Sequence, residues 1–372
     1  MIDTRLRRRR AILLGATGSV GQRFARLLEH HPWFELTTLC ASERSTCRAY
    51  REVARWVQDA PIPERFAERR VESCAPDDHA WPAGDPPLVF SALDADVAGP
   101  LESAWAQRGA LVVSNASSHR MTRGVPLVVP EVNPEHLELA PARGGRVLCN
   151  PNCTTIGLSL VLAPLVREFG VEAVQLTSLQ AVSGAGLDGP SAFEMLGEVV
   201  PLITGEEEKL ERETRVIFGE CAGGVLRPRD AFVRATCTRV PVVDGHTLSI
   251  SVRLTRPTDE PELCAALEGF RGLPQQLGLP SAPERPLRFL DDSDPPRPRR
   301  DAARFGGMTT ILGRLRRRSA REWDLVALTH NTLRGAAGGA LLLAELAVAR
   351  EAGLDSASDA RSPRAEPVQR LP

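Results

Sequence analysis

Short apolar runs alternate with amphipathic stretches over the first 150 residues of the chain. The runs have the length of buried strands, and the stretches between them repeat apolar positions with the period of a helix. The strand-like runs cover 10–14, 34–42, 87–93 and 110–117, and the helical stretches cover 22–31 and 97–109. Strands that alternate with helices are typical of a parallel, doubly wound sheet. We therefore expect residues 1–152 to form an α/β domain of this kind.

The pattern changes after residue 153. Longer segments now alternate apolar and polar positions with a period of two, which indicates an antiparallel sheet with one covered face. These segments lie at 171–182, 231–242, 246–254 and 321–330. We expect a second, α+β domain over 153–330 with a mainly antiparallel sheet. A stretch at 275–305, rich in Pro, Asp and Arg, predicts an irregular excursion within it.

The end of the chain predicts one further helix and a tail. Residues 335–351 have the pattern of an amphipathic helix, and we expect the segment 331–353 to return to the first domain. The polar stretch 354–372 lacks the apolar residues that a packed segment needs, which predicts disorder.

Composition narrows the classes of function. The chain has 372 residues, 42% hydrophobic and 25% charged, as in water-soluble globular proteins, and this length favours two domains. Its net charge of −1 gives no argument for nucleic acid or a membrane surface as a partner, despite the basic run at 5–10. The apolar run that follows is too short to cross a bilayer, and no signal-peptide cleavage pattern follows it.

The cysteines and the lysine carry separate information. Eight Cys occur without a CxxC pair or a Cys/His cluster of zinc-site spacing. This usage predicts free thiols in a reducing cytosol, a cytoplasmic protein and no metal site. Lys209 is the single lysine among 46 basic residues, which indicates either chance survival or a site that requires a compact ammonium.

A glycine-rich loop connects the first strand to the first helix. Its residues are Gly15, Thr17, Gly18, Ser19, Val20 and Gly21. Glycines at such spacing allow a tight turn, a close approach of the backbone to a pyrophosphate, and close packing of helix on strand. We therefore expect a dinucleotide-binding (Rossmann) domain.

The end of the second strand predicts which dinucleotide binds. An NAD site places an acidic side chain there to hold the ribose 2′-hydroxyl, whereas Ser42, Arg44 and Ser45 can receive a 2′-phosphate. Glu43 is an acidic side chain in the same loop and favours NAD instead. We expect NADP(H) as the cofactor.

Cys153 lies in the sequence NPNCTT, directly ahead of a long apolar run. A thiol at a helix N-terminus faces unpartnered backbone N–H groups and the positive end of the helix dipole. We therefore expect a lowered thiol pKa and a reactive thiolate, which in a redox enzyme forms a thiohemiacetal or a thioester. The alternative is a buried, structural cysteine, a role that suits Cys149 better.

A nucleophilic thiol needs an acid or a base beside it, and the seven His are the candidates. His246 follows an Asp244–Gly245 turn that can aim it inward. The others lie in polar, surface-like contexts (His30, His31, His79 and His136) or at strand ends (His119 and His330). We expect His246 to be the acid/base.

Ordered matches over about 10–350 make the chain similar to the aspartate-β-semialdehyde dehydrogenase family, in its archaeal and fungal branch. They are GATGSVGQRF, SNASSHRM, VPEVNPEHL, NPNCTTIGL, LQAVSGAG, GEEEKLERET, RVPVVDGHT and HNTLRGAAGGA. The resemblance implies an enzyme of amino-acid biosynthesis that reduces L-aspartyl 4-phosphate to L-aspartate 4-semialdehyde and phosphate with NADPH. It also implies a homodimer or homotetramer with contacts made by the second domain's sheet.

The resemblance implies roles for the matched residues. Cys153 is the nucleophile that forms the acyl-thioester, Asn152 orients the reacting carbonyl, and His246 is the acid/base. Further positions bind substrate: Arg239 binds its carboxylate, Glu206 its ammonium, and Arg120 and Lys209 its phosphate, while Gln180 contacts the substrate. Ser183, Gly184 and Asn331 line the nicotinamide side of the site.

The chain departs from the family's motifs at two places, and other functions are alternatives for the same set of residues. The family's SAGKKY after the second strand is STCRAY here, with Cys47 in place of Gly, and Leu187 replaces a frequent aromatic.

A malonyl-CoA reductase of the same branch is the first alternative, but it has no substrate ammonium for Glu206 to hold. N-acetyl-glutamyl-phosphate reductase is a more distant relative. A non-catalytic NADP-binding regulator would lack at least one of the matched chemical groups.

Overall fold

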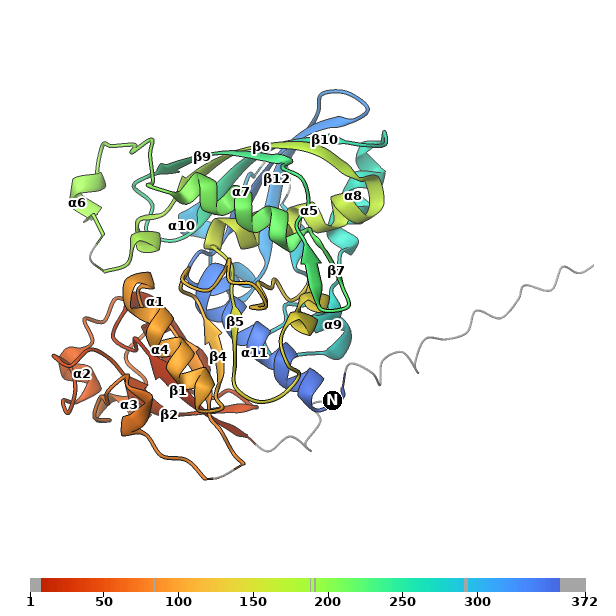
Figure 1. The fold of residues 1–372 in the computed structure, drawn as a ribbon. Helices are drawn as coiled ribbons and strands as arrows, with labels where there is room; N and C mark the ends of the chain where they lie inside the picture. The colour runs from red at the N-terminus through yellow and green to blue at the C-terminus, as the bar shows by residue number, and fades with distance from the viewer. Residues whose placement is uncertain (1–7, 83, 188, 191, 291–293, 355–372) are drawn as a thin grey trace, which may run out of the picture.

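The computed structural model describes residues 8–82, 84–187, 189–190, 192–290 and 294–354. The predictions for the start of the basic run and for the tail beyond residue 354 fall outside the described residues. In Figure 1 a parallel sheet lies at the lower left, a larger sheet lies across the top, and helices fill the space between them.

The first sheet is parallel, with the strand order β2-β1-β3-β4-β5. Its strands are β1 (Arg9–Leu14), β2 (Phe34–Cys40), β3 (Leu88–Ser91), β4 (Leu111–Ser114) and β5 (Arg146–Cys149), and its covering helices are α1 (Ser19–Leu28), α4 (Ala95–Gln107) and α11 (Gly338–Glu351). Alternate residues of β1 face opposite sides: Ile12 lies in one apolar cluster with Trp105 of α4. Leu13 lies in another with Phe24 of α1 and Leu341 of α11. The predicted doubly wound α/β domain is confirmed.

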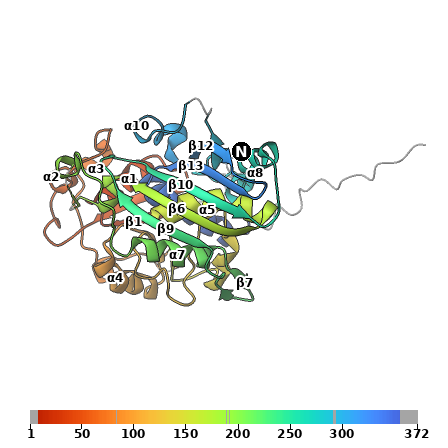
Figure 2. The same ribbon diagram turned by 90° about the horizontal axis from the view of Figure 1, so that it is seen from above.

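The second sheet has the order β11-β12-β13-β10-β6-β9. Its strands are β6 (Val171–Gln180), β9 (Val233–Arg239), β10 (His246–Leu254), β11 (Leu287–Phe289), β12 (Thr310–Arg317) and β13 (Glu322–Thr329). The four central strands pair antiparallel, and the edge strands β11 and β9 pair parallel. Along β10, Leu248 and Ile250 are buried while Ser249 and Ser251 are exposed, so one face is covered as expected. Figure 2 shows the strands of this sheet side by side from above.

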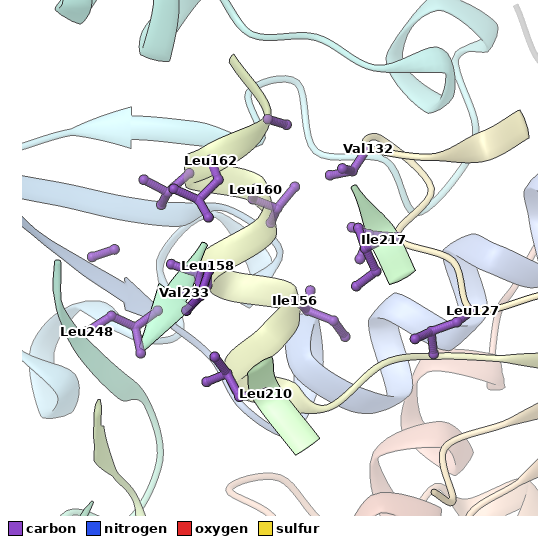
Figure 3. Packing of buried hydrophobic residues seen from close by; sticks show 14 of the residues in the cluster. Leu127, Val132, Ile156, Leu158, Leu160, Leu162, Leu210, Ile217, Val233 and Leu248 are labelled. Carbon is purple, nitrogen blue, oxygen red and sulfur yellow. The ribbon is translucent and has the colours of Figure 1, made fainter. Parts of the chain in front are cut away.

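Helix α5 (Cys153–Phe169) lies at the centre of the larger core. Figure 3 shows Ile156, Leu158 and Leu160 of this helix among apolar side chains of α7 (Glu206–Ile217) and of the larger sheet. A helix that is apolar on all sides must be enclosed. A Cβ on Gly157 would lie 2.6 Å from Cγ2 of Thr329, so glycine permits the close packing of α5 on the sheet. The enclosure fixes the place of the helix N-terminus.

Most of the described residues of 275–305 lie outside helices and strands, as expected, but the region also contains short elements. These are α9 (Leu273–Leu277), β11, α10 (Pro298–Asp301) and the 3₁₀ turn η4 (Arg304–Gly307). Such short elements carry too few residues for a period to be recognised, and β11 is a strand because it pairs with β12.

The remaining elements are short apart from α8. They are α2 (Tyr50–Val53), α3 (Glu64–Ala67), η1 (Pro76–Asp78), η2 (Pro134–Leu139), η3 (Val182–Ala185), α6 (Ala192–Met195), β7 (Glu220–Ala222), β8 (Val225–Arg227), α8 (Glu260–Gly269) and a π-helical turn η5 (Leu333–Ala337) that leads into α11. Within the described part of the chain, the helices are all too short or too polar to cross a membrane.

Candidate active site

Cys153 is the first residue of α5, just beyond the carboxyl end of β5. Asn152 caps the helix: its side-chain oxygen accepts hydrogen bonds from the N–H groups of Thr154 at 2.8 Å and Thr155 at 3.3 Å. The amide nitrogen of Asn152 donates to Glu206 at 2.8 Å. Both ends of this amide are therefore occupied by protein groups, so in this structure Asn152 positions the start of the helix that carries the thiol.

The thiol of Cys153 and the imidazole of His246 face each other, with Sγ and Nε2 3.2 Å apart. Cys153 is partly exposed, and His246 is fully buried at the start of β10. The turn before His246 depends on Gly245, whose φ is +98° and whose Cβ would lie 2.9 Å from that of Ala302. The N–H of Gly245 donates to Oδ1 of Asn331 at 2.8 Å, which fixes the turn.

The expected lowering of the thiol pKa is wrong for this structure. Burial raises the pKa of Cys153 to about 12, Glu206 adds to the rise, and Arg120 and Arg239 offset part of it. Burial, together with Arg239, lowers the pKa of His246 to about 3. Lost solvation thus outweighs the roughly half charge that a helix N-terminus presents to the thiol.

The second ring nitrogen of His246 contacts the backbone. The N–H of Ala181, which follows the end of β6, donates to Nδ1 at 3.1 Å. On another side, a Cβ on Gly184 would lie 3.2 Å from Cε1 of the ring. The imidazole is thus held on three sides, by the thiol, a backbone amide and a glycine.

Three buried polar side chains lie beside these groups, at the ends of β6 and β9 and at the start of α7. One oxygen of Glu206 accepts from the amide nitrogens of Asn152 at 2.8 Å and Gln180 at 3.2 Å. Arg239 donates to the carbonyl of Ala181 at 2.8 Å. Burial lowers the pKa of Arg239, but arginine stays charged at neutral pH. One site thus holds an anion and a cation, as the recognition of an amino acid requires.

Arg120 lies in the loop after β4 and is also buried. It donates to Glu213 of α7 at 2.9 Å and to the carbonyl of Asn115 at 2.7 Å. The second oxygen of Glu213 accepts from the backbone N–H of Asn152 at 2.7 Å. The Nε of Arg120 is buried without a hydrogen-bond partner among the described residues. This nitrogen is the donor that a ligand could use.

Glu213 is a residue of the candidate site that the sequence analysis did not name. It follows Glu206 by seven residues on α7, and Lys209 follows Glu206 by three. Residues at these spacings share one face of a helix. Lys209 is half-buried on that face. The spacing of seven residues between Glu206 and Glu213 in GEEEKLERET was the sequence signal that both side chains lie on one face of the helix.

The glycine loop leaves the start of α1 open. Gly18 is the N-cap and offers no side chain to the first N–H groups, those of Ser19, Val20 and Gly21. Gly15 has a φ of +74°, and a Cβ there would lie 2.5 Å from the carbonyl oxygen of Ala92. A Cβ on Gly21 would lie 2.1 Å from the carbonyl oxygen of Gly15. The carbonyl of Thr17 is taken by the side chain of Gln22. Such a cradle fits a pyrophosphate.

The loop after β2 holds Ser42, Arg44 and Ser45. The first two are exposed, Ser45 is half-buried, and its N–H donates to the carbonyl of Ser42 at 2.8 Å. Cys47 adopts a φ of +66°, the left-handed region that favours glycine, which explains why glycine is usual at this position. The N–H of Cys47 donates to the carbonyl of Val71 at 2.8 Å. This hydrogen bond holds the loop in the left-handed conformation although the residue is not glycine. An exposed guanidinium and two hydroxyls fit a ribose 2′-phosphate.

The predicted nicotinamide-side residues surround the His246 turn. Asn331 donates from its amide to Oγ of Ser183 at 2.8 Å. Gly184 packs so closely that a Cβ would lie 3.0 Å from a guanidinium nitrogen of Arg239. A side chain at position 184 would displace both Arg239 and His246.

Two further residues outside the predicted set shape the site. Arg23 of α1 donates to Oγ1 of Thr332 and to Oδ2 of Asp244, both at 3.2 Å, and so links the cofactor-side helix to the turn before His246. Gly335 of the π-helical turn leaves room for the nucleophile, since a Cβ there would lie 2.6 Å from that of Cys153. Both lie within the matched motifs GATGSVGQRF and HNTLRGAAGGA, but their contacts come from distant parts of the chain.

Three histidines expected in surface-like contexts are buried. His31 faces the buried carboxylate of Glu345 at 2.8 Å, His136 contacts the carbonyl of Gly219 at 3.3 Å, and His79 contacts a backbone carbonyl. Because each ring finds polar partners inside the fold, a polar sequence context did not indicate exposure.

Comparisons with known proteins cover nearly the whole chain. Residues 10–140 match the family model described as semialdehyde dehydrogenase, NAD binding domain, and residues 162–334 match the semialdehyde dehydrogenase, dimerisation domain. Aspartate-semialdehyde dehydrogenase of Methanothermobacter thermautotrophicus is 46% identical over 90% of this chain and 97% of its own length. The enzyme of that name from Candida albicans is 42% identical over 92% and 98%.

Solved structures of aspartate semialdehyde dehydrogenases also superpose on nearly the whole chain. The crystal structure of aspartate semialdehyde dehydrogenase with NADP from Candida albicans superposes with a TM-score of 0.84 at 40% identity, over 92% of this chain and 99% of that one. Aspartate semialdehyde dehydrogenase II of Vibrio cholerae, complexed with ASA, superposes with a TM-score of 0.74 at 26% identity, over 92% and 98%.

Proposed function

Because the chain belongs to the aspartate-semialdehyde dehydrogenase family, we propose that it reduces L-aspartyl 4-phosphate to L-aspartate 4-semialdehyde and phosphate with NADPH. The observation that carries the proposal is the 3.2 Å contact between the Cys153 thiol and the His246 imidazole at the start of a helix. Arg239 and Glu206 beside it supply a cation and an anion for an α-amino acid.

Cys153 attacks the acyl carbon of the substrate, and phosphate leaves as the thioester forms. Arg239 binds the α-carboxylate. Glu206 accepts from the α-ammonium, because its two bonds to Asn152 and Gln180 use part of a carboxylate's four acceptor sites. A malonyl-CoA substrate would leave Glu206 without a cation, so the buried carboxylate supports the amino-acid substrate.

The leaving phosphate is stabilised by Arg120 and Lys209. The Nε–H of Arg120 is its donor without a partner in the described chain, and its other nitrogens are held by Glu213 and Asn115. Lys209 adds a half-buried ammonium from the same helix face as Glu213. Fixed cations placed where negative charge develops lower the barrier without reorganisation.

NADPH, when bound, supplies the hydride that reduces the thioester to the aldehyde. Three groups of residues fit it. Those for the pyrophosphate are Gly15, Thr17, Gly18, Ser19, Val20 and Gly21; those for the 2′-phosphate are Ser42, Arg44 and Ser45; those for the nicotinamide side are Ser183, Gly184 and Asn331. Turnover with NADPH well above turnover with NADH tests the second group.

Replacing Cys153 tests the proposal directly. We expect Cys153→Ala to abolish NADPH oxidation with aspartyl phosphate while NADPH affinity, measured by fluorescence titration, stays unchanged. Cys221→Ala, in the β7–β8 hairpin, is the matched control and keeps full turnover. Substantial turnover by Cys153→Ala contradicts the role of the thiol. Faster oxidation of NADPH with malonyl-CoA than with aspartyl phosphate contradicts the substrate.

The matched dimerisation domain supports a homodimer or a homotetramer. Phe193, Leu196 and Leu202 are 84%, 68% and 63% exposed near one edge of the larger sheet, which is costly in a monomer. Free thiols such as Cys74 and Cys221 favour a reducing, cytoplasmic location. Sedimentation equilibrium tests the assembly, and a monomer at micromolar concentration contradicts it.

A further inference from the structure

We propose that Glu207 and Glu211 of α7 are positioning residues for substrate binding. Their carboxylates hold the edge strand β9 by its backbone, and this contact fixes the separation of Glu206 and Arg239. The inference rests on the proposed function, in which Glu206 binds the α-ammonium of the substrate and Arg239 binds its α-carboxylate. It assigns a role to two further acidic residues of the GEEEKLERET motif.

β9 lies at the edge of the larger sheet, and its outward N–H groups need partners from outside the sheet. It ends the order of the described strands and pairs there with β6. Alternate residues of a strand point their N–H groups to opposite sides. The N–H of Val240, just beyond the strand, points inward and donates to the carbonyl of Gln180 at 3.0 Å. The N–H groups of Ala235, Cys237 and Arg239 therefore point outward.

Each of these three outward N–H groups is bound. Oε1 of Glu211 accepts from the N–H of Ala235 at 3.1 Å, and Oε1 of Glu207 accepts from that of Cys237 at 2.9 Å. The N–H of Arg239 donates to a backbone carbonyl at 2.8 Å. Two carboxylates four residues apart on one helix thus take the places that a neighbouring strand would fill.

Helix α7 presents different faces to the site and to the strand. Glu206 and Glu213 are seven residues apart and share the face that contacts Asn152. Successive residues of a helix turn by about 100°, so Glu207 and Glu211 lie on another face. Figures 1 and 2 both show α7 alongside β9. One helix therefore carries the carboxylate for the ammonium and the two carboxylates that hold the strand.

The strand carries the other binding group. Arg239 is the last residue of β9, two residues after Cys237, so the bond from Glu207 lies close to the point where the guanidinium is attached. Burial lowers the pKa of Arg239, and Glu206 is near enough to oppose that change. Gln180, the register partner of Arg239, donates to Glu206 at 3.2 Å. The carboxylate and the guanidinium are thus neighbours whose spacing depends on how α7 lies on β9.

An amino acid requires this spacing to be constant. Its α-ammonium and α-carboxylate are attached to one carbon, so the anion and the cation that bind them must keep a fixed separation. A bond between two side chains, such as that of Glu206 and Gln180, can follow a shift of the strand by a change of rotamer. Bonds from a carboxylate to backbone N–H groups are charge-assisted and hold the strand itself.

The end of β9 is the part that moves when these bonds are lost. Helix α7 is anchored on its other side by Leu210 and Ile217, which are buried in the larger core. The edge strand has a neighbouring strand on one side only of the described sheet. Loss of the two carboxylates therefore displaces Arg239 and leaves Lys209, the phosphate-binding residue of the helix, in place.

The kinetic constants of the reverse reaction test the inference. L-aspartate 4-semialdehyde, phosphate and NADP⁺ are assayed with Glu207→Ala/Glu211→Ala and with both single variants. We expect KM for the semialdehyde to rise about 10–100-fold in the double variant, the scale of a displacement of up to about 1 Å. KM for phosphate and for NADP⁺, and kcat, should stay within about threefold, because Arg239 binds a non-reacting group equally in the ground and transition states.

Two further variants control for charge and for stability. Glu208→Ala removes an exposed carboxylate of the same helix and should leave all three KM values unchanged. Glu207→Gln keeps an oxygen acceptor for the N–H of Cys237 and should keep KM for the semialdehyde near the wild-type value. A general loss of stability lowers the folded fraction and hence kcat, but it does not raise KM for one substrate. Unchanged KM for the semialdehyde in the double variant, or an equal rise in all three KM values, overturns the inference.

Hydrogen exchange measures the bonds to the strand directly. In the double variant the N–H groups of Ala235 and Cys237 lose their acceptors. We expect amide exchange in a peptide that covers 233–239 to be about tenfold faster than in the wild type, while exchange in 171–180 of β6 is unchanged. Equal exchange of 233–239 in the two proteins overturns the inference.

Failure of the inference is distinguishable from failure of the proposed function. Wild-type protein that does not turn over aspartate semialdehyde contradicts the proposed function, and hydrogen exchange still tests the bonds to β9. Active wild-type protein with unchanged KM in the double variant contradicts only the positioning role.

Discussion

Glu213 is the residue on which two parts of the site depend together. One of its oxygens holds Arg120, and the other holds the N–H of Asn152, the residue that caps the nucleophile's helix. The carboxylate and the guanidinium are both almost fully buried. Removing one member of such a pair leaves an uncompensated charge in a low-dielectric interior.

Glu213→Gln keeps the shape of this side chain and removes its charge. We expect the free energy of unfolding to fall by about 3–5 kcal/mol and turnover to fall with it, because Arg120 loses its counter-ion. Urea denaturation measures the first effect and NADPH oxidation the second. Glu262→Gln is the control: its pair with Arg256 is half exposed, and its loss should cost at most about 1 kcal/mol. Equal costs for the two variants contradict the role of Glu213.

Among the elements, the turn that leads into β10 places the imidazole of His246 beside the thiol of Cys153. It is held from α1 by the pair of Arg23 and Asp244, and from the segment after β13 by Asn331. Gly245 is required there for two reasons, a φ of +98° and the close contact with Ala302. Gly278, at the end of α9, has a positive φ of +63° but open space around it.

This difference predicts the outcome of two alanine substitutions. Gly278→Ala should cost about 1 kcal/mol, the strain of a left-handed residue alone. Gly245→Ala adds a steric clash, so we expect a larger loss of stability, of about 3 kcal/mol, and a fall in kcat because His246 moves away from the sulfur. Thermal unfolding and steady-state kinetics of both variants check this. A Gly245→Ala enzyme with normal kcat would show that the turn does not position the ring.

At the scale of the whole molecule, buried histidines set the response to acid. Burial lowers the pKa of His246 to about 3 and that of His330 to about 4, below the value of about 6.5 in an unfolded chain. Below pH 6.5 the unfolded chain binds protons that the folded chain does not. Stability therefore falls as the pH falls from about 6.5 toward 4.

Replacing a buried histidine should change the pH dependence of the free energy of unfolding more than replacing an exposed histidine does. Each buried ring contributes a slope of up to about 1.4 kcal/mol per pH unit in that window. We expect His330→Gln to have a shallower fall in the free energy of unfolding between pH 6.5 and 4.5 than the wild type. His30→Gln, whose ring is 85% exposed, should keep the wild-type slope. Denaturant titrations at several pH values measure both, and identical slopes for all three proteins contradict the prediction.

Features that depend on neighbours along the chain were predictable from the amino-acid sequence. The period of β10, the glycine loop before α1 and the position of Cys153 at a helix start follow from local backbone geometry, and the structure has them at those places. The resemblance of the motifs to one enzyme family is confirmed by relatives that match nine-tenths of the chain. The roles of the site residues stay predictions.

Tertiary structure alone decided the electrostatics of the site. The thiol and the imidazole come from positions 93 residues apart, and Glu213 reaches Arg120 across a similar separation. Burial reversed the expected direction of the Cys153 pKa, and the backbone N–H of Ala181, just beyond the end of β6, donates to Nδ1 of His246. Desolvation and long-range hydrogen bonds depend on what the rest of the chain encloses, and the residues next to Cys153 and His246 in the sequence carry no record of it.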